Sequence, residues 1–182
     1  AVVKRKIPIV PTFTFQANLI DYGHFVGAST YIKDLFRREI IDSAEMLRKA
    51  YDHGVPILCG TESGFSVTPY GQWHYREMEI LMKEMGFTAL EAIRSSTSVN
   101  AFAMRLEGEI GRIEEGAFAD LIIVSVDPIK DITSLGDLEN IKMIMKSGEI
   151  QKFEEEMNRL SIPGWRVVSY GQILSKDLVN KK

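Results

Sequence analysis

The first half of the chain alternates extended apolar segments with an amphipathic one. Residues Ile7 to Phe15 are rich in β-branched and aromatic side chains around Pro11, which is typical of a strand. Proline cannot donate a ladder hydrogen bond, so we expect Pro11 at the carboxyl end of this strand. From Asp34 to Asp52 apolar residues recur at helical spacing with charged residues between them, and Gly54 supplies the helix stop.

A short apolar run from Val55 to Cys59 follows directly and is bounded by Gly54 and Gly60. Because it contains no polar position, it predicts a strand that is buried on both faces. Residues Ile7 to Cys59 therefore predict a strand, helix, strand unit, and such units are parallel and right-handed. The predicted fold class is α/β.

Three further helices are predicted after this unit. One runs from about Gln72 to Met85. Thr88 begins the next, because Glu91 stands at the spacing of a capping box. Ser98 or Asn100 begins a short final helix.

The pattern changes after Leu106, where glycines separate short segments. The apolar run from Leu121 to Val124 predicts a buried strand. Ile141 to Met145 and Ile150 to Phe153 flank a Lys-Ser-Gly-Glu turn, which predicts a β-hairpin. The tail from Glu154 to Lys182 is more polar and predicts a short helix followed by an irregular end.

Composition and charge narrow the classes of partner. The chain has 182 residues, a formal net charge of −3 and a pI near 5.7, with dispersed Lys and Arg residues. We therefore expect no nucleic-acid partner and no membrane partner. One cysteine excludes an internal disulfide framework, and no apolar run approaches the roughly 18 residues that span a bilayer. A soluble cytoplasmic protein is expected, and the start at Ala1 is typical of the interior of a longer protein.

Candidate chemistry lies just after the Val55 to Cys59 run. Thr61, Glu62 and Ser63 stand between two glycines at the carboxyl end of this predicted strand. In parallel α/β folds, that end of a strand is where active sites are built. Glu62 is therefore the candidate catalytic or ligand-binding carboxylate. The alternative is that it caps the following loop or pairs with a nearby basic group.

The other residues capable of chemistry are 3 histidines and one cysteine. A catalytic zinc site needs about three protein ligands, and the histidines form no His-x-His or His-x-x-x-His pair. His53 is interpreted as a helix-end residue that faces the negative end of the helix dipole. His24 and His74 lie in a loop and at a helix start, where each either contacts a substrate or is structural. Cys59 ends a buried strand, which favours a structural role over a nucleophilic one.

Three stretches together resemble the carboxyl half of a metal-dependent amidohydrolase. They are GTESGFSVTPYGQWHYREMEILMKEMGFTALEAIRSSTSVNAFAMRL, GEIGRIEEGAFADLIIVSVDPIKDI and IKMIMKSGEI. The similar branch of that superfamily contains imidazolonepropionase and the Xaa-Pro and Xaa-Arg dipeptidases, and the resemblance covers about Ile7 to Ile150. Its most specific parts are three. They are Gly60, Thr61 and Glu62 after the predicted strand, the stretch from Ala92 to Ala101 with Thr97 and Asn100, and Gly111, Gly116, Ala119, Asp120 and Leu121 with Asp127 and Pro128.

The resemblance implies the carboxyl-terminal part of a (β/α)8 TIM barrel together with strands of a small β-sandwich. Ile7 to Phe15 would be the seventh barrel strand, and Val55 to Cys59 the eighth. Residues 1–107 would then form the partial barrel, 108–153 the sandwich segment and 154–182 a carboxyl-terminal tail.

The resemblance also implies hydrolysis of an amide, cyclic amide or dipeptide C–N bond by water that a divalent metal, such as zinc, activates. Glu62 stands where the family usually has an aspartate, which binds the metal or accepts a proton from its water. Glutamate is one methylene longer, which displaces the carboxylate by roughly 1.5 Å. The other metal ligands would lie outside this chain. His24 and His74 would contact a small amide or dipeptide substrate.

Two functions follow from different classes. In the first, the chain is the carboxyl-terminal part of a metal-dependent hydrolase and is inactive in isolation. In the second, it is a non-catalytic remnant that acts as an association module. In both, open sheet edges predict association, either with another copy as an oligomer or with the remainder of the barrel.

Overall fold

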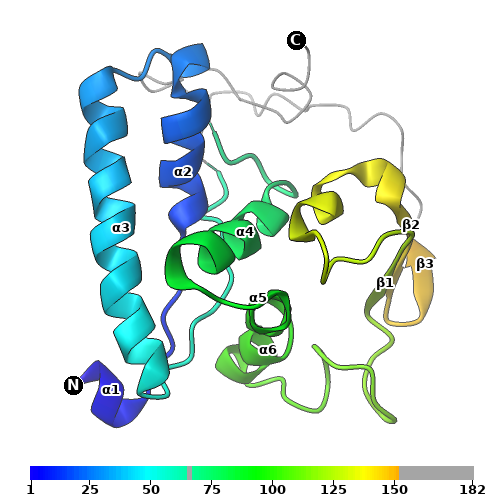
Figure 1. The fold of residues 1–182 in the computed structure, drawn as a ribbon. Helices are drawn as coiled ribbons and strands as arrows, with labels where there is room; N and C mark the ends of the chain where they lie inside the picture. Colours follow the sequence, from blue (N-terminus) through cyan, green and yellow to red (C-terminus); the bar gives the residue numbers. More distant parts are fainter. Residues whose placement is uncertain (65–66, 152–182) are drawn as a thin grey trace, which may run out of the picture.

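The amino-terminal third of the chain is helical, and two of its helices lie side by side (Figure 1). The computed structural model describes residues 1–64 and 67–151. A single helical turn, α1 (Val2–Arg5), is followed by α2 (Phe13–Tyr22), a 3-10 turn (Gly23–Val26) and the long α3 (Thr30–Asp52). The helix predicted from Asp34 is therefore confirmed and begins earlier.

The cap of α3 explains where this helix begins. The side chain of Ser29 accepts a hydrogen bond from the backbone N–H of Ile32 at 3.3 Å, so one of the free donors of the first turn is satisfied. At the other end, His53 is the C-cap, and its Nδ1 lies 2.7 Å from the carbonyl oxygen of Lys49. The prediction that His53 is a helix-end residue is confirmed.

Three shorter helices follow the loop after Cys59, as predicted. They are α4 (His74–Met85), α5 (Ala89–Ser96) and α6 (Ser98–Met104). The capping box is confirmed, because the Thr88 side chain accepts from the Glu91 backbone while the Glu91 carboxylate accepts from the Thr88 backbone.

The two predicted parallel strands are shorter than expected. They meet at one parallel bridge, between Ile9 and Ile57. The Ile9 N–H donates to the Pro56 carbonyl at 3.0 Å, and the Leu58 N–H donates to the Ile9 carbonyl at 2.9 Å. The prediction of burial holds for the second segment, in which Val55 and Ile57 are each 1% exposed.

The strand predicted from Ile7 to Phe15 is wrong at its carboxyl end, because α2 begins at Phe13. Pro11 and the left-handed Thr12, whose φ is 57°, end the extended segment. The N–H groups of Phe13 and Thr14 at the start of α2 donate to the carboxylate of Glu77 on α4. Such a distant acceptor has no signature within the segment itself.

A three-stranded antiparallel sheet, ordered β1-β2-β3, lies on the side of the molecule away from α3 (Figure 1). It consists of β1 (Leu121–Val124), β2 (Ile141–Lys146) and β3 (Glu149–Gln151). The predicted hairpin is confirmed, and its turn residues Ser147 and Gly148 have φ of 51° and 83°.

The prediction that β1 is buried is wrong. Ile122 and Ile123 are 60% and 47% exposed, although they point to opposite faces of the sheet. β1 is an edge strand, and within the described residues little covers either of its faces. An apolar run therefore indicated a strand here without fixing its burial.

The main hydrophobic core lies between α2, α3, α4 and the parallel segments. Its buried members are Phe13, Ala17, Ile40, Ala44, Val55, Ile57, Ile80, Leu81, Met85 and Phe87. A second contact joins the sheet region to the helices, because Ile132 packs with Met78 and Ala92. Gly136 allows a close approach there, since a Cβ at this position would lie 2.5 Å from the ring of Tyr75.

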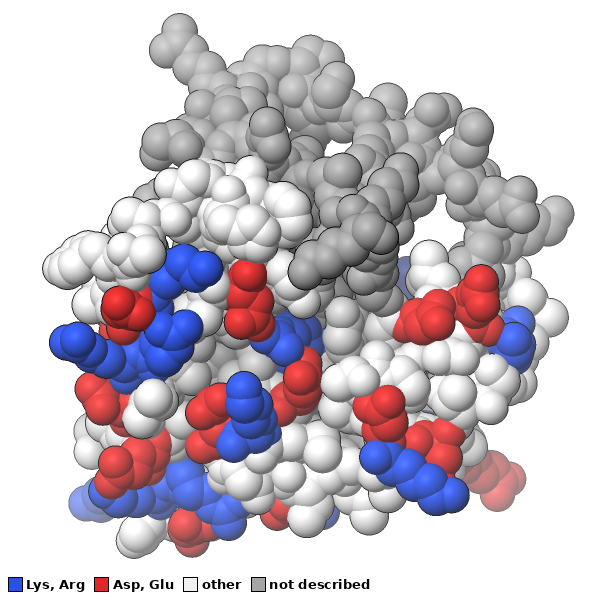
Figure 2. Space-filling view, turned by 45° about the horizontal axis from the view of Figure 1, so that its top comes forward, with Lys and Arg blue, Asp and Glu red and all other residues white. Residues whose placement is uncertain are grey.

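Charge is evenly mixed on the face that Figure 2 shows. Acidic and basic side chains alternate among the described residues there, with no broad patch of one sign. Within residues 1–64 and 67–151, no helix combines the length and the apolar character needed to cross a bilayer. The predictions for the tail from Glu154 to Lys182, and for Phe153 at the hairpin end, lie outside the described residues.

Candidate functional site

Glu62 lies where the sequence places it, three residues after Cys59 at the carboxyl end of the buried parallel segment. Its side chain is exposed, and its backbone has φ of 51°, in the left-handed region that a residue with a Cβ seldom adopts. Thr61 beside it is only 5% exposed, and its hydroxyl lies 2.6 Å from that of Ser63. The burial of Thr61 thus fixes the backbone position from which the exposed carboxylate of Glu62 projects.

Hydrogen bonds within the loop hold this backbone. The Thr68 hydroxyl donates to the carbonyl of Glu62 at 3.2 Å, and the Gly64 N–H donates to the carbonyl of Thr68 at 2.9 Å. Thr68 and Val67 are both 0% exposed, so the returning side of the loop is anchored in the interior.

The histidines do not join Glu62 in a ligand set. His24 lies in the 3-10 turn after α2, exposed, with its ring centroid 4.0 Å from that of Phe25. His74 is the first residue of α4, and partial burial lowers the pKa of its imidazole. Within residues 1–64 and 67–151, no three His, Cys, Asp or Glu side chains come together in a group that could hold a metal. Glu62 is thus the one candidate ligand that the sequence predicted and the fold places at a strand end.

Cys59 has the environment of a structural residue. Burial raises the pKa of its thiol to about 12, so the thiolate is absent at neutral pH. Its Sγ lies 3.7 Å from the carbonyl oxygen of His74, and its own carbonyl accepts from the Asn100 side chain at 3.0 Å. These contacts fix the strand end, which agrees with the role predicted for it.

Glu77 is a buried carboxylate whose role was not predicted from the sequence. It is 0% exposed, although it is a carboxylate. Its Oε1 accepts from the Phe13 N–H at 3.0 Å, while Oε2 accepts from the Thr14 N–H at 2.7 Å and the Thr14 hydroxyl at 2.5 Å. The residue preceding α2 makes no side-chain cap, so Glu77 of α4 caps this helix from outside. One signal was present, because Glu77 stands one turn before Leu81 on the apolar face of α4.

The pKa of Glu77 predicts a pH-dependent stability. Burial raises this pKa from the ordinary 4.5 to about 7, and the hydrogen bonds from Thr14 and Phe13 oppose the rise. Because the folded chain then binds the proton more tightly than the unfolded chain does, the contribution of Glu77 to stability is full below about pH 4.5. It is lost as the pH rises to about 7.

Urea unfolding of the wild type and of Glu77→Gln, which cannot titrate there, isolates this contribution. We expect the free energy of unfolding of the wild type, minus that of the variant, to fall by about 3 kcal/mol between pH 4.5 and 7. It should be flat above pH 7. A difference that is constant, or that rises with pH, would contradict the raised pKa.

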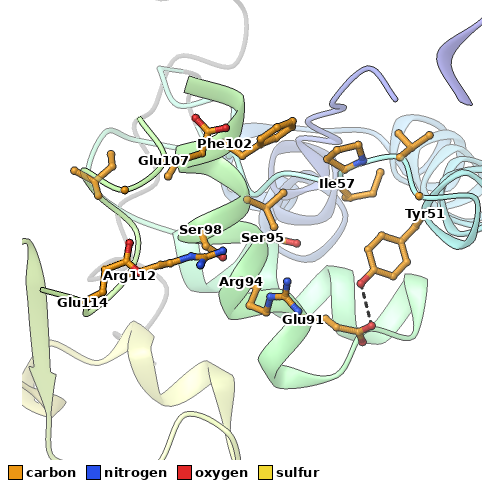
Figure 3. Close-up of a pocket in the computed structure, with 17 residues that line it drawn as sticks. Tyr51, Ile57, Glu91, Arg94, Ser95, Ser98, Phe102, Glu107, Arg112 and Glu114 are labelled. Carbon is orange, nitrogen blue, oxygen red and sulfur yellow. Dashed lines mark hydrogen bonds between the residues drawn. The ribbon is translucent and has the colours of Figure 1, made fainter. Parts of the chain in front are cut away.

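A cavity of about 450 Å³ lies at the other end of the buried segment from Glu62, beside α5 and α6 (Figure 3). Its rim carries charges of both signs, including Arg94, Arg112 and Glu114, and the Tyr51 hydroxyl donates to Glu91 at 3.0 Å. Backbone and side chains of Val55, Pro56 and Ile57 form one wall. None of the predicted site residues Glu62, His24 and His74 lines this cavity, although Ile57 in its wall stands only a few positions before Glu62.

Comparison with known proteins places these features in context. The sequence model of the amidohydrolase family matches residues 30–151. No curated protein sequence matches the chain.

Solved structures share its fold. A Xaa-Pro dipeptidase with bound methionine in the active site is 31% identical, with a TM-score of 0.63 over 84% of this chain and 36% of that one. An amidohydrolase is 27% identical, with a TM-score of 0.67 over 85% of this chain and 37% of that one. A prolidase candidate from Bifidobacterium longum is 22% identical, with a TM-score of 0.69 over 94% of this chain and 38% of that one. The present chain therefore spans well under half of the length of these structures.

Proposed function

This chain belongs to the amidohydrolase family, and we propose that it forms the carboxyl-terminal part of an enzyme that hydrolyses a C–N bond in an amide, cyclic amide or dipeptide. The observation that carries the proposal is the family match over residues 30–151. The 31% identity to a Xaa-Pro dipeptidase favours a dipeptide among these substrates. The chain covers only 38% and 36% of the length of two of these solved structures, which supports its being part of a longer enzyme.

The open edge of the buried parallel segment supports a partial (β/α)8 barrel. Ile57 bridges Ile9 on one side, yet its own N–H and carbonyl have no hydrogen-bond partner among residues 1–64 and 67–151. Because Ile57 is 1% exposed, these groups would be costly to leave unpaired, and a further strand would satisfy them. We assign Val55 to Cys59 as the last barrel strand, residues 1–107 as the barrel part and 108–153 as part of a β-sandwich.

The same edge and the exposed isoleucines of β1 predict association of the isolated chain. These surfaces would be covered either by the remainder of the barrel or by another copy of this chain in an oligomer. Light scattering coupled to gel filtration should find masses above 20.6 kDa at micromolar concentrations. A single monomeric mass at every concentration would contradict it.

For the chemistry, we propose Glu62 as the base that takes a proton from the water that attacks the amide carbonyl. Its position after a parallel strand and its exposed carboxylate support this role. His74 and His24 are proposed as substrate contacts at the same end of the barrel. A neutral His74, favoured by its lowered pKa, can both donate and accept a hydrogen bond there.

A divalent metal, such as zinc, would supply the Lewis acid that activates the water in this family. The described residues do not fit such an ion by themselves, because no three potential ligands come together in them. Glu62 is the one ligand that we assign to this chain. The others are proposed to lie in a part of the enzyme outside these 182 residues.

The isolated chain is accordingly expected to bind no catalytic metal tightly. One carboxylate cannot provide the affinity of three or four ligands. The chain is washed with a chelator, mixed with one equivalent of zinc and separated from free zinc by gel filtration. Elemental analysis should then find well under one zinc ion per chain. A stoichiometric ion that survives gel filtration would overturn the ligand assignment.

Hydrolysis tests the proposed function itself. The complete enzyme that contains this chain is incubated with Xaa-Pro dipeptides, N-acyl amino acids and a cyclic amide, with and without a chelator. We expect release of an amine or amino acid from at least one class, and loss of that release in chelator. No release from any of the three classes would contradict the proposal.

A further inference from the structure

The side chain of Asn18 reaches from α2 to the loop that carries Glu62. Its Nδ2 donates to the carbonyl of Val67 at 2.8 Å, and both residues are 0% exposed. The bond joins residues 49 apart in sequence. It ties a rigid helix to the returning side of the loop, next to Thr68, whose hydroxyl bonds the Glu62 carbonyl.

Glu62 needs such support because of its backbone. A residue with a Cβ at φ of 51° is held in a sparsely populated conformation, which persists only where the surroundings over-determine it. The side chain of Glu62 is exposed, so its own packing contributes little to holding it. The loop hydrogen bonds of Thr68 and Gly64 act on this backbone, and both depend on where Val67 and Thr68 are fixed.

The support continues into the core through Thr14. Thr14 and Asn18 are one turn apart on the same buried face of α2, and Thr14 is held by the carboxylate of Glu77. Two buried polar contacts on one face of α2 therefore join this helix to α4 and to the loop.

We propose that Asn18 is a positioning residue for Glu62, acting through its hydrogen bond to the Val67 carbonyl. The importance of this contact for catalysis rests on the proposed function, in which Glu62 is the base. The contact itself is tested without any assay of activity, so the two ideas can fail separately.

Hydrogen exchange resolved to single amides, in the 182-residue chain, measures the contact. The reporter is the Gly64 amide, which is bonded to Thr68, and the internal reference is the Val55 amide, bonded to Ala50 at 3.0 Å. In Asn18→Leu the buried Val67 carbonyl loses its donor. The Asn18 Oδ1 has no partner among the described residues, so the substitution frees no other group. We expect exchange at Gly64 to become about tenfold faster relative to exchange at Val55.

Gln16→Leu is the matched control. It removes an amide donor from the same helix, because Gln16 Nε2 bonds Glu39 at 2.8 Å, but it faces α3 rather than the loop. It should leave the ratio of the two exchange rates unchanged. If Asn18→Leu does not fold, Asn18→Ala removes the same donor without added bulk and is expected to give the same selective increase.

Asn18→Asp provides a readout that a merely structural role would not give. A protonated carboxyl group can donate to the Val67 carbonyl, whereas a carboxylate cannot. Protection of Gly64 relative to Val55 should therefore be near the wild-type level at about pH 4 and fall at neutral pH. Exchange at Gly64 that is unchanged in Asn18→Leu or Asn18→Ala, or that rises only in step with Val55, would overturn the inference.

Discussion

Replacing Glu77 with alanine is expected to lower the free energy of unfolding by about 3 to 5 kcal/mol. The substitution removes the acceptor for the N–H groups of Phe13 and Thr14 and for the Thr14 hydroxyl. These donors start a helix whose preceding residue provides no side-chain cap, so they would be left buried and unpaired. The lost side-chain volume adds a cavity in the core.

Glu84→Ala is the matched control for this measurement. Glu84 lies on the same helix, and its carboxylate forms an ion pair of 3.7 Å with the exposed Lys83. Its replacement should change the free energy of unfolding by no more than about 0.5 kcal/mol. Urea denaturation at about pH 4.5, where the contribution of Glu77 to stability is full, compares the two variants with the wild type. Equal effects of Glu77→Ala and Glu84→Ala would show that α2 does not depend on the Glu77 carboxylate.

Glu62→Gln in the complete enzyme is expected to lower turnover by roughly 10² to 10⁴-fold while the fold survives. The amide keeps the size and the hydrogen bonds of the side chain but removes the basic site. Because the Glu62 side chain is exposed, the thermal stability of the variant should match that of the wild type.

Metal content separates the two roles of Glu62. If Glu62 is the base, Glu62→Gln keeps its metal and loses turnover. If it is chiefly a ligand, metal and turnover fall together, because a neutral amide is a poorer ligand for a divalent cation. Glu62→Asp introduces the shorter carboxylate that the resemblance to metal-dependent amidohydrolases implies at this position. It should retain substantial activity if the pocket tolerates the shorter side chain, and lose most of it if neighbouring groups have adapted to the longer reach.

The elements that the sequence predicted correctly depend on local signals. The helix ending at Asp52 has a clear amphipathic period, and the capping box of Thr88 is complete within four residues. The hairpin turn at Ser147 and Gly148 likewise needs only the conformations of its own residues.

The predictions were wrong where contacts with residues distant in the sequence determine the secondary structure or the burial of a segment. The segment up to Phe15 has strand composition, yet its carboxyl end is helical because an acceptor 64 residues away caps it. Ile122 and Ile123 fit a buried strand, but burial depends on what covers the sheet and not on the run itself.

The candidate site divides in the same way. The position of Glu62 could be predicted, because a polar group directly after a buried parallel strand is a local pattern, whereas its role in catalysis stays a prediction. The left-handed backbone of Glu62 and its support by Asn18 could not be, since both follow from how α2 packs against the loop. The roles of His24 and His74 as substrate contacts stay predictions.

The most direct measurement of the central claim is the ratio of kcat/KM for the complete enzyme and its Glu62→Ala variant, on the best C–N substrate and at matched metal content. The proposed base predicts a ratio of at least about 100, with unfolding transitions that coincide. A ratio near one would contradict it, because the carboxylate of Glu62 would then take no part in the hydrolysis.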